Sequence, residues 1–358
     1  MKLFKCQSCG QILYFENTSC ESCGHLLGYL PQDMTLSALE PNGDLFCAIA
    51  APDRPVRLCD NAGYGACNWL VEADGVSTLC VACRHNHMIP DLSIALNQER
   101  WKRLELAKRH LFYSLLRLRL PLVTRIDDPE HGLAFDFLAD NPGTTGPKVM
   151  TGHDNGLITI ALIEADDAER ERRRTQMHEP YRSLLGHFRH EVGHYFWDVL
   201  VRDGGRLDEC RAVFGDDSQS YEAALQTHYT NGPPADWQEH YVSQYASTHP
   251  WEDWAETWAH YLHIVDTLEM ARAFGITVKP RLVRDETLSA VIDLDPYDAE
   301  TGMTNIIGGW LPLTFAMNSL NRAMGNPDLY PFVLSPTVVT KLGFVHDVVH
   351  GRRPNDGT

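Results

Sequence analysis

The cysteines are the feature of this 358-residue chain that most limits how it can fold. Nine of its ten cysteines lie within the first 83 residues, and Cys210 stands apart from them. The first four form two C-x2-C knuckles separated by ten residues: Cys6, Cys9, Cys20 and Cys23. Four thiolates at this spacing can surround one ion tetrahedrally, and a closed four-sulfur shell suits structural Zn2+. We therefore expect a zinc-stapled region at this end of the chain.

A second group of cysteines follows at a looser spacing, with one C-x2-C knuckle: Cys59, Cys67, Cys80 and Cys83. We expect a second structural zinc site there, giving one or two structural ions in all. Three other residues could compete as ligands: Cys47, His85 and His87. Of these, Cys47 is more simply explained as a small buried side chain. Zinc sites of this kind staple small domains, or they bind protein or nucleic acid.

The charge of the chain favours some of these roles over others. The formal net charge is −17, whereas phosphate binding demands Lys and Arg. We therefore expect a staple or a contact with protein, rather than binding to nucleic acid or to an anionic membrane. One basic run, Arg170–Arg174, is more simply a solvated charged segment that leads into a helix.

The sequence also bears on the compartment. It contains no run of about 18 uncharged apolar residues that could span a membrane. Its first residues lack the apolar core and the small-residue cleavage site of a signal peptide. Paired cysteine knuckles in such a chain indicate metal binding in a reducing compartment. We expect a cytoplasmic protein that makes no membrane contact.

Beyond residue 95 the composition changes to charged and apolar residues at helical spacing. After this first helix we expect a strand in "LAFDFL" and a hairpin that turns at Asp154-Asn155-Gly156. Another helix should open at Pro180 and stop at Gly204, and a third should run from Pro250 to about Gly275. The remainder is expected to be mostly helical.

The helix expected after Pro180 carries the sequence His190-Glu191-Val192-Gly193-His194, which reads H-E-x-x-H. Residues four apart share one face of a helix, so His190 and His194 can present two imidazoles to one zinc ion. Glu191 then stands beside the metal, where it can act on a water whose pKa zinc lowers to about 7. The pattern therefore predicts a catalytic zinc site.

Such a site needs a third protein ligand. The extended pattern with another histidine six residues on fails, because that position is Leu200. Asp198 shares the helix face but suits a supporting role or a helix salt bridge. The next predicted helix offers Glu252 and Glu256 one turn apart, with tryptophans on its packing side. Both carboxylates could face solvent. If they are buried, however, each needs a partner or a metal ion, because an unpaired buried carboxylate is costly. We therefore expect one of them to be the ligand.

These residues resemble the pattern of a gluzincin, a zinc peptidase with H-E-x-x-H on one helix and a glutamate ligand on a later one. The second helix looks like that of lethal-factor-type peptidases. The resemblance implies that Glu252 binds zinc, that Glu256 orients a ligand histidine and that Tyr245 stabilises the oxyanion. The chain departs from the pattern by reading Trp251-Glu252-Asp253-Trp254, which displaces the aromatic residue by one position. The choice between Glu252 and Glu256 therefore stays open.

Nearly the whole chain is also similar to a bacterial family of zinc-binding metallopeptidases with an N-terminal zinc-ribbon domain. The similarity is carried by five strings: "RLCDNAGYGACNWLV", "LCVACRHNHMIPDLS", "TGHDNGLITIALIEADDAERERRR", "EPYRSLLGHFRHEVGHYFWD" and "LNRAMGNPDLYPFVLSP". The expected fold is α+β, with a zinc-ribbon region followed by a mainly helical, zincin-like domain that contains a small sheet. We expect four parts: a zinc ribbon over 1–35, a second four-cysteine region over 36–94, a catalytic domain over 95–275, and a helical part over 276–358 packed on it.

The predicted chemistry is hydrolysis of a peptide or related amide bond. Glu191 would take a proton from the zinc-activated water and deliver it to the leaving amine, while Tyr245 donates to the oxyanion. The substrate would be a peptide or protein. The strand Leu157–Leu162 could form the cleft edge along which the substrate adds as another strand, or it could be an ordinary sheet strand. A protein partner could bind through the zinc ribbon.

Two other functions stay open. The chain could be an interaction module, in which the zinc ribbons recruit protein or nucleic acid and the His/Glu site is structural or inactive. The presence of Glu191 is partial evidence against the interaction-module hypothesis, because a purely structural zinc site needs no free carboxylate beside the metal. The chain could also be a zinc amidase that acts on a non-protein amide. The active-site cleft of such an amidase would differ in width from that of an endopeptidase.

Overall fold

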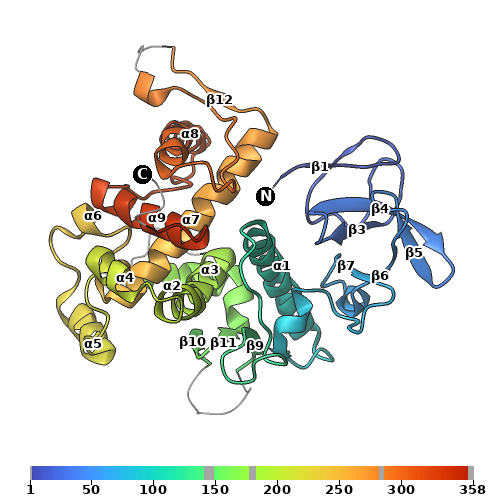
Figure 1. The fold of residues 1–358 in the computed structure, drawn as a ribbon, viewed down its shortest axis with the longest axis horizontal. Coiled ribbons are helices and arrows are strands. Elements are labelled where there is room, and N and C mark those ends of the chain that lie inside the picture. Colours follow the sequence, from blue (N-terminus) through green and yellow to red (C-terminus); the bar gives the residue numbers. More distant parts are fainter. Residues whose placement is uncertain (1, 141–148, 177–182, 282–285, 354–358) are drawn as a thin grey trace. The chain divides into compact units, whose positions relative to one another are not determined.

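A computed structural model describes residues 2–140, 149–176, 183–281 and 286–353 (Figure 1). The chain forms two compact units, residues 1–177 and 178–358, and the division falls inside the segment 95–275. The α+β class predicted from the sequence is confirmed, with sheets in the cysteine-rich first unit and mainly helices in the second. Within the described ranges, no helix has the length and apolar character needed to cross a membrane.

The first unit contains short strands, one long helix and several shorter helical segments. Its strands are β1 (Phe4–Lys5), β2 (Ile12–Leu13), β3 (Leu27–Leu30), β4 (Thr35–Asn42), β5 (Leu45–Ala48), β6 (Pro55–Leu58), β7 (Leu70–Glu72), β8 (Asn86–Met88), β9 (Ala134–Leu138), β10 (Gly152–Asp154) and β11 (Leu157–Ala161). Its helices are η1 (Asp60–Tyr64), η2 (Cys83–His85), α1 (Ala95–Arg117), η3 (Leu162–Ala165) and α2 (Asp167–Gln176). Strands β3 to β7 form an antiparallel sheet in chain order. Apolar side chains of this sheet form one core cluster: Leu30, Leu39, Ala48, Val56 and Leu70.

A second sheet has the strand order β10-β11-β9-β8. The predicted hairpin is confirmed: β10 and β11 are antiparallel, and the turn residues Asn155 and Gly156 have φ of 45° and 82°, as a two-residue turn between twisted strands requires. Of the two expectations for the strand Leu157–Leu162, the structure fits an ordinary sheet strand and not an edge open to a peptide. That strand, β11, pairs with β9 along its whole length and with β10 over residues 157–159, so it lies inside the sheet. Pairing order depends on contacts distant in sequence, which alternation along one strand does not reveal.

The basic run forms part of α2, and its described arginines are paired with acidic residues. Arg170, Arg172 and Arg174 pair with acidic residues three positions earlier, at Asp167, Glu169 and Glu171. Pairs at this spacing lie on one helix face. The run thus lies within a helix instead of leading into one, and its described arginines are paired with carboxylates of the same helix.

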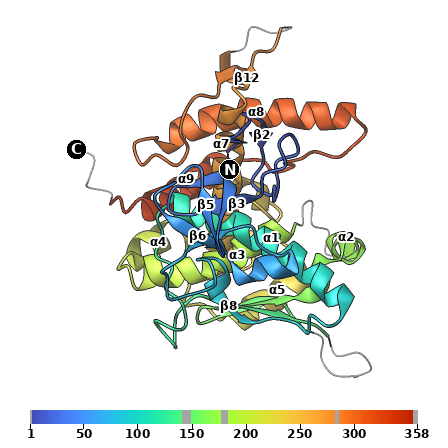
Figure 2. The same cartoon turned by 90° about the vertical axis from the view of Figure 1, so that its right-hand side faces the viewer.

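The second unit is built around one long helix, α7. Its elements are α3 (Leu184–Phe196), the π-helical turn η4 (Trp197–Arg202), α4 (Leu207–Phe214), α5 (Tyr221–Asn231), α6 (Trp237–His240), η5 (Tyr245–Ser247), α7 (Pro250–Ala273), β12 (Thr277–Val278), η6 (Glu286–Leu288), β13 (Ala290–Val291), α8 (Met303–Ala323) and α9 (Pro336–Val349). Helices α3, α8 and α9 all pack against α7. Figure 2 shows α8 along its length, in orange.

The helices that matter for the site have clear ends. Ser183 caps α3 by accepting a hydrogen bond from the amide of Gly186 at 3.0 Å, whereas the predicted start at Pro180 lies outside the described residues. The predicted helix from Pro250 is confirmed, with proline in its first turn and His249 as the capping residue. The cap is an imidazole nitrogen that accepts from the amide of Trp251 at 3.1 Å.

A glycine sets how closely α3 approaches α7. A Cβ atom on Gly193 would lie 3.1 Å from the Cα of Ala255 and 3.1 Å from Cδ1 of Trp258. The indole Nε1 of Trp254 donates to the carbonyl oxygen of Gly193 at 2.8 Å. The tryptophan side of α7 therefore faces the H-E-x-x-H helix, which brings the ligand-bearing faces of α3 and α7 together.

Candidate metal centres

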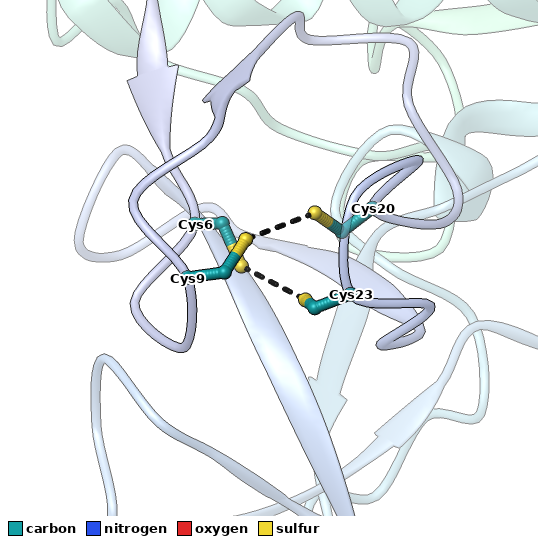
Figure 3. A group of neighbouring side chains, drawn as sticks. All are labelled: Cys6, Cys9, Cys20 and Cys23. Atoms are coloured by element: carbon teal, nitrogen blue, oxygen red, sulfur yellow. Dashed lines mark hydrogen bonds between the residues drawn. The ribbon is translucent and has the colours of Figure 1, made fainter.

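The first four cysteines converge from two turns (Figure 3). The Sγ atoms of Cys6 and Cys23 lie 3.6 Å apart, as do those of Cys9 and Cys20. A tetrahedral zinc ion with bonds of about 2.3 Å needs sulfurs roughly 3.8 Å apart, so the four thiolates fit one ion. Each knuckle ends in a glycine with positive φ, Gly10 at 80° and Gly24 at 75°. The glycines let each chain fold back so that both cysteines of a knuckle face the same point.

The second group of cysteines also converges, and all four are buried: Cys59, Cys67, Cys80 and Cys83. The Sγ atoms of Cys67 and Cys80 are 3.7 Å apart. The three competing residues have other partners. His85 is hydrogen-bonded to the carbonyl oxygen of Leu133 and His87 to Asp136, both at 2.8 Å, while Cys47 lies near the carbonyl of Pro52.

The two histidines of H-E-x-x-H meet a carboxylate of α7. The Nε2 atoms of His190 and His194 are 3.2 Å apart, and Oε2 of Glu252 lies 3.0 Å from the first and 3.5 Å from the second. Ligands bound tetrahedrally to zinc at about 2.0–2.1 Å are separated by roughly 3.3 Å, so these three atoms match the edges of such a site. His194 and Glu252 are buried, and His190 is half-buried.

The two oxygens of Glu252 have different surroundings. Oε1 accepts a hydrogen bond from the hydroxyl of Tyr221 at 2.5 Å. Oε2 is buried and faces both imidazoles, and no described group other than these two rings lies against it as a partner. A buried carboxylate oxygen is costly without a partner, and a metal ion between it and the imidazole nitrogens would be such a partner. Burial alone would raise the pKa of Glu252, but the two histidines outweigh this effect and hold the pKa well below its usual range.

Glu256 lies on the other side of the same histidine. Its Oε1 is 2.8 Å from Nδ1 of His190, and its Oε2 accepts from the hydroxyl of Ser243 at 2.6 Å. Burial alone would lower the pKa of His190, but the hydrogen bonds to Glu252 and Glu256 outweigh burial and raise it well above its usual value. Glu252 thus lies at Nε2 of both histidines, whereas Glu256 lies at Nδ1 of His190.

Glu191 and Tyr245 flank the cluster. Glu191 is half-buried, and burial raises the pKa of its carboxyl, with Glu252 and Glu256 acting in the same direction and the histidines opposing. Tyr245 begins η5, and its ring centre lies 5.9 Å from that of His190. Burial, followed by the charge of Glu252, raises the pKa of Tyr245, so its hydroxyl keeps its proton. The cluster therefore combines a carboxylate of raised pKa with a neutral hydroxyl donor.

Asp198 takes part in an ion pair within its own helical segment. It accepts from Arg202 at 2.8 Å within the π-helical turn η4. This is the helix salt bridge that the sequence offered as the alternative to a supporting role at the metal.

Three contacts around the cluster were not foreseen from the sequence. Tyr221 bonds Glu252 and Ser243 bonds Glu256, across 31 and 13 residues of chain. Trp251, expected on the packing side of α7, instead lies on the ring of His194 with centroids 3.7 Å apart. Nothing periodic in the sequence connects Tyr221 or Ser243 to the glutamates, whereas Trp251 could have been placed by its position next to Glu252.

Comparison with known proteins agrees with this arrangement. A family described as "Putative zinc-binding metallo-peptidase" matches residues 97–348, and a zinc-ribbon domain family matches residues 3–94. Uncharacterized proteins of Mycobacterium tuberculosis and Mycobacterium bovis are 42% identical over 356 residues, which cover 99% of this chain and 97% of each relative. No solved structure matches the chain. The first of these matches covers both histidines, all the carboxylates of the cluster and the tyrosines around it. This chain therefore belongs to the family described as "Putative zinc-binding metallo-peptidase" and carries a zinc-ribbon domain over residues 3–94.

Proposed function

We propose that this protein is a zinc-dependent hydrolase of peptide or related amide bonds. The observation that carries the proposal is the convergence of Oε2 of Glu252 on the Nε2 atoms of His190 and His194, with Glu191 on the same helix. Three protein ligands leave a fourth position, as in catalytic rather than structural zinc sites. In this proposal the site is of the gluzincin kind, with two histidines and a glutamate as ligands.

In this proposal His190, His194 and Glu252 hold the ion. Zinc bound there would lower the pKa of a water molecule to about 7 and polarise the substrate carbonyl. Glu191 would accept a proton from that water and return it to the leaving amine, a role that its raised pKa favours because a carboxylate of higher pKa is a stronger base. Tyr245, which keeps its proton, would donate to the oxyanion.

Glu256 has a supporting role in the proposal. Its carboxylate on Nδ1 of His190 favours the tautomer that leaves Nε2 free to bind the metal. Such partners of a ligand histidine fix its ring orientation and raise its basicity. This division of roles is the one that the lethal-factor-type pattern implies.

The two cysteine clusters would each hold one structural zinc ion, in addition to the catalytic ion. Their thiolates must stay reduced, so we infer a reducing compartment such as the cytoplasm. The substrate would be a peptide or protein, and the zinc ribbon could contact a protein partner.

The substitution Glu191→Gln tests the proposal. It keeps the size of the side chain and removes the proton acceptor, so hydrolysis should be lost while zinc at the His/Glu site is retained. Equal hydrolysis by the native and substituted proteins would overturn it.

A further inference from the structure

Tyr221 is the one side chain of α5 with a hydrogen bond to the proposed metal ligands among the described contacts. Its hydroxyl donates to Oε1 of Glu252 at 2.5 Å, on the side of the carboxylate away from the imidazoles. We propose that Tyr221 is a positioning residue, which holds Glu252 so that only Oε2 faces the metal position. The inference rests on the proposed function, because it assigns a role at the same site.

The ring of Tyr221 is fixed from two sides. It meets His249 edge to face with centroids 5.4 Å apart and Trp251 with centroids 5.7 Å apart. His249 in turn caps α7 and is hydrogen-bonded through Nε2 to the carbonyl of Gln219 at 3.2 Å. These contacts tie Tyr221 to the start of α7, one turn from the carboxylate that it holds.

The contact is not part of a hydrophobic core. Helix α5 is described in full, and none of its residues is buried. Tyr221 itself is only half-buried. Core packing therefore gives no reason for a tyrosine here, whereas the hydroxyl bond to Glu252 does.

Tyr221 and the proposed oxyanion donor Tyr245 share the charge of Glu252. Burial, followed by the charge of Glu252, raises the pKa of both tyrosines, so both hydroxyls keep their protons beside the ligand. Of the two, Tyr221 is the one whose hydroxyl bonds the carboxylate. Without that hydroxyl, Oε1 of Glu252 loses the partner that orients it.

The orientation of Glu252 matters because a carboxylate can bind a metal through one oxygen or two. A second bound oxygen would take up the position that water and the substrate carbonyl need. A hydrogen bond to Oε1 stabilises binding through Oε2 alone. Removing it should weaken metal binding and also change the geometry of the bound ion.

The test uses Tyr221→Phe, which keeps the ring and its contacts. Cobalt(II) is titrated into full-length protein whose cysteine sites retain zinc, and its affinity is measured by competition with a chelator. We expect affinity at the His/Glu site to fall about 10- to 100-fold, the usual cost of losing a partner of a metal ligand. The visible absorption of the bound cobalt should also change, because its coordination changes.

Two further variants make the result specific. Tyr229→Phe removes a hydroxyl from a 67% exposed tyrosine of the same helix and should leave affinity and spectrum unchanged. Tyr245→Phe removes the group proposed to act on substrate, so it should lower kcat while cobalt affinity stays near that of the native protein. Thermal unfolding of all three variants checks that the fold is intact.

A Tyr221→Phe protein that binds cobalt with native affinity and a native spectrum would overturn the inference. The readouts need no substrate, so this failure is distinct from failure of the proposed function. Weakened cobalt binding in Tyr221→Phe would support the positioning role even if the native protein hydrolysed no peptide. Absence of cobalt binding at His190, His194 and Glu252 in the native protein would overturn both.

Discussion

Nδ1 of His190 lies 2.8 Å from Oε1 of Glu256, while Nε2 of the same ring faces Oε2 of Glu252 at 3.0 Å. The two glutamates of α7, one turn apart, therefore hold opposite edges of one imidazole. A carboxylate behind a histidine selects the tautomer with its proton on that side, which leaves the other nitrogen as a metal ligand. The spacing of the glutamates along α7 thus fits one ligand and one orienting group.

Glu256→Gln should weaken metal binding without removing a ligand. The amide keeps the size of the side chain but lacks the charge that favours the metal-binding tautomer of His190. We expect zinc affinity at the His/Glu site to fall about 10-fold, at the low end for such partners. Chelator competition measures it, with Glu239→Gln as a control at an exposed carboxylate of α6. Native affinity in Glu256→Gln would show that Glu256 does not support the ligand.

Gly193→Ala should destabilise the protein, although alanine is the better helix former. The new Cβ would lie 3.1 Å from the backbone of Ala255 on α7, so the helices must move apart. We expect a loss of about 1–3 kcal/mol, typical of overpacking. Gly343→Ala, in the middle of α9 with no atom within 4 Å of its new Cβ, should instead gain about 0.5–1 kcal/mol. Denaturant unfolding measures both, and the same sign of change in both variants would contradict the close approach of α3 and α7.

Zinc affinity at the His/Glu site should still change with pH at pH values above the ordinary pKa of histidine. In the metal-free protein, Glu252 and Glu256 raise the pKa of His190 above its ordinary value of about 6.5. Because the raised pKa keeps a proton on the ring at neutral pH, that proton must leave when zinc binds, and affinity rises as pH rises through the raised pKa. Calorimetric titration in buffers of different ionisation enthalpy counts the protons released. Binding that is independent of pH above 6.5 would contradict the flanking of His190 by two carboxylates.

Lys341→Met should destabilise the protein by about 3–5 kcal/mol, the usual cost of leaving one member of a buried ion pair alone. Lys341 of α9 donates to Oδ2 of Asp253 at 2.5 Å and to the carbonyl oxygen of His240 at 2.7 Å, and both side chains of the pair are at most 5% exposed. Burial raises the pKa of Asp253 to about 7, and Lys341 opposes this effect. Adding Asp253→Asn should offset part of the loss, because no charge is then left buried. If Lys341→Met unfolds at the same denaturant midpoint as the native protein, the ion pair with Asp253 does not stabilise the fold.

The sequence alone predicted those features that depend on residues close together in the chain. Each C-x2-C knuckle followed by glycine closes within a few residues, and His190 and His194 share a face because they are four apart on one helix. The start of α7 followed from Pro250 and the acidic residues after it. Such features depend on backbone geometry over one or two turns, which residue spacing reports directly.

The rest depends on contacts between elements. Whether Glu252 or Glu256 faces the imidazoles depends on how α7 packs on α3, which Gly193 and the tryptophans determine. The bond from Tyr221 spans 31 residues, and the central position of β11 comes from its pairing with β9. Residue spacing carries no information on these contacts, because loops set the distances between the elements.

The central claim is that Glu191 and the zinc position form a hydrolytic site. The most direct test is cleavage of a diverse peptide library, read by mass spectrometry, with native protein and Glu191→Gln at equal, measured zinc content. The account predicts products from the native protein and a loss of rate of about 10²- to 10⁴-fold in the variant, the range for removing a general base. Zinc-loaded native protein that yields no products, or a variant that yields the same products at the same rate, would contradict it.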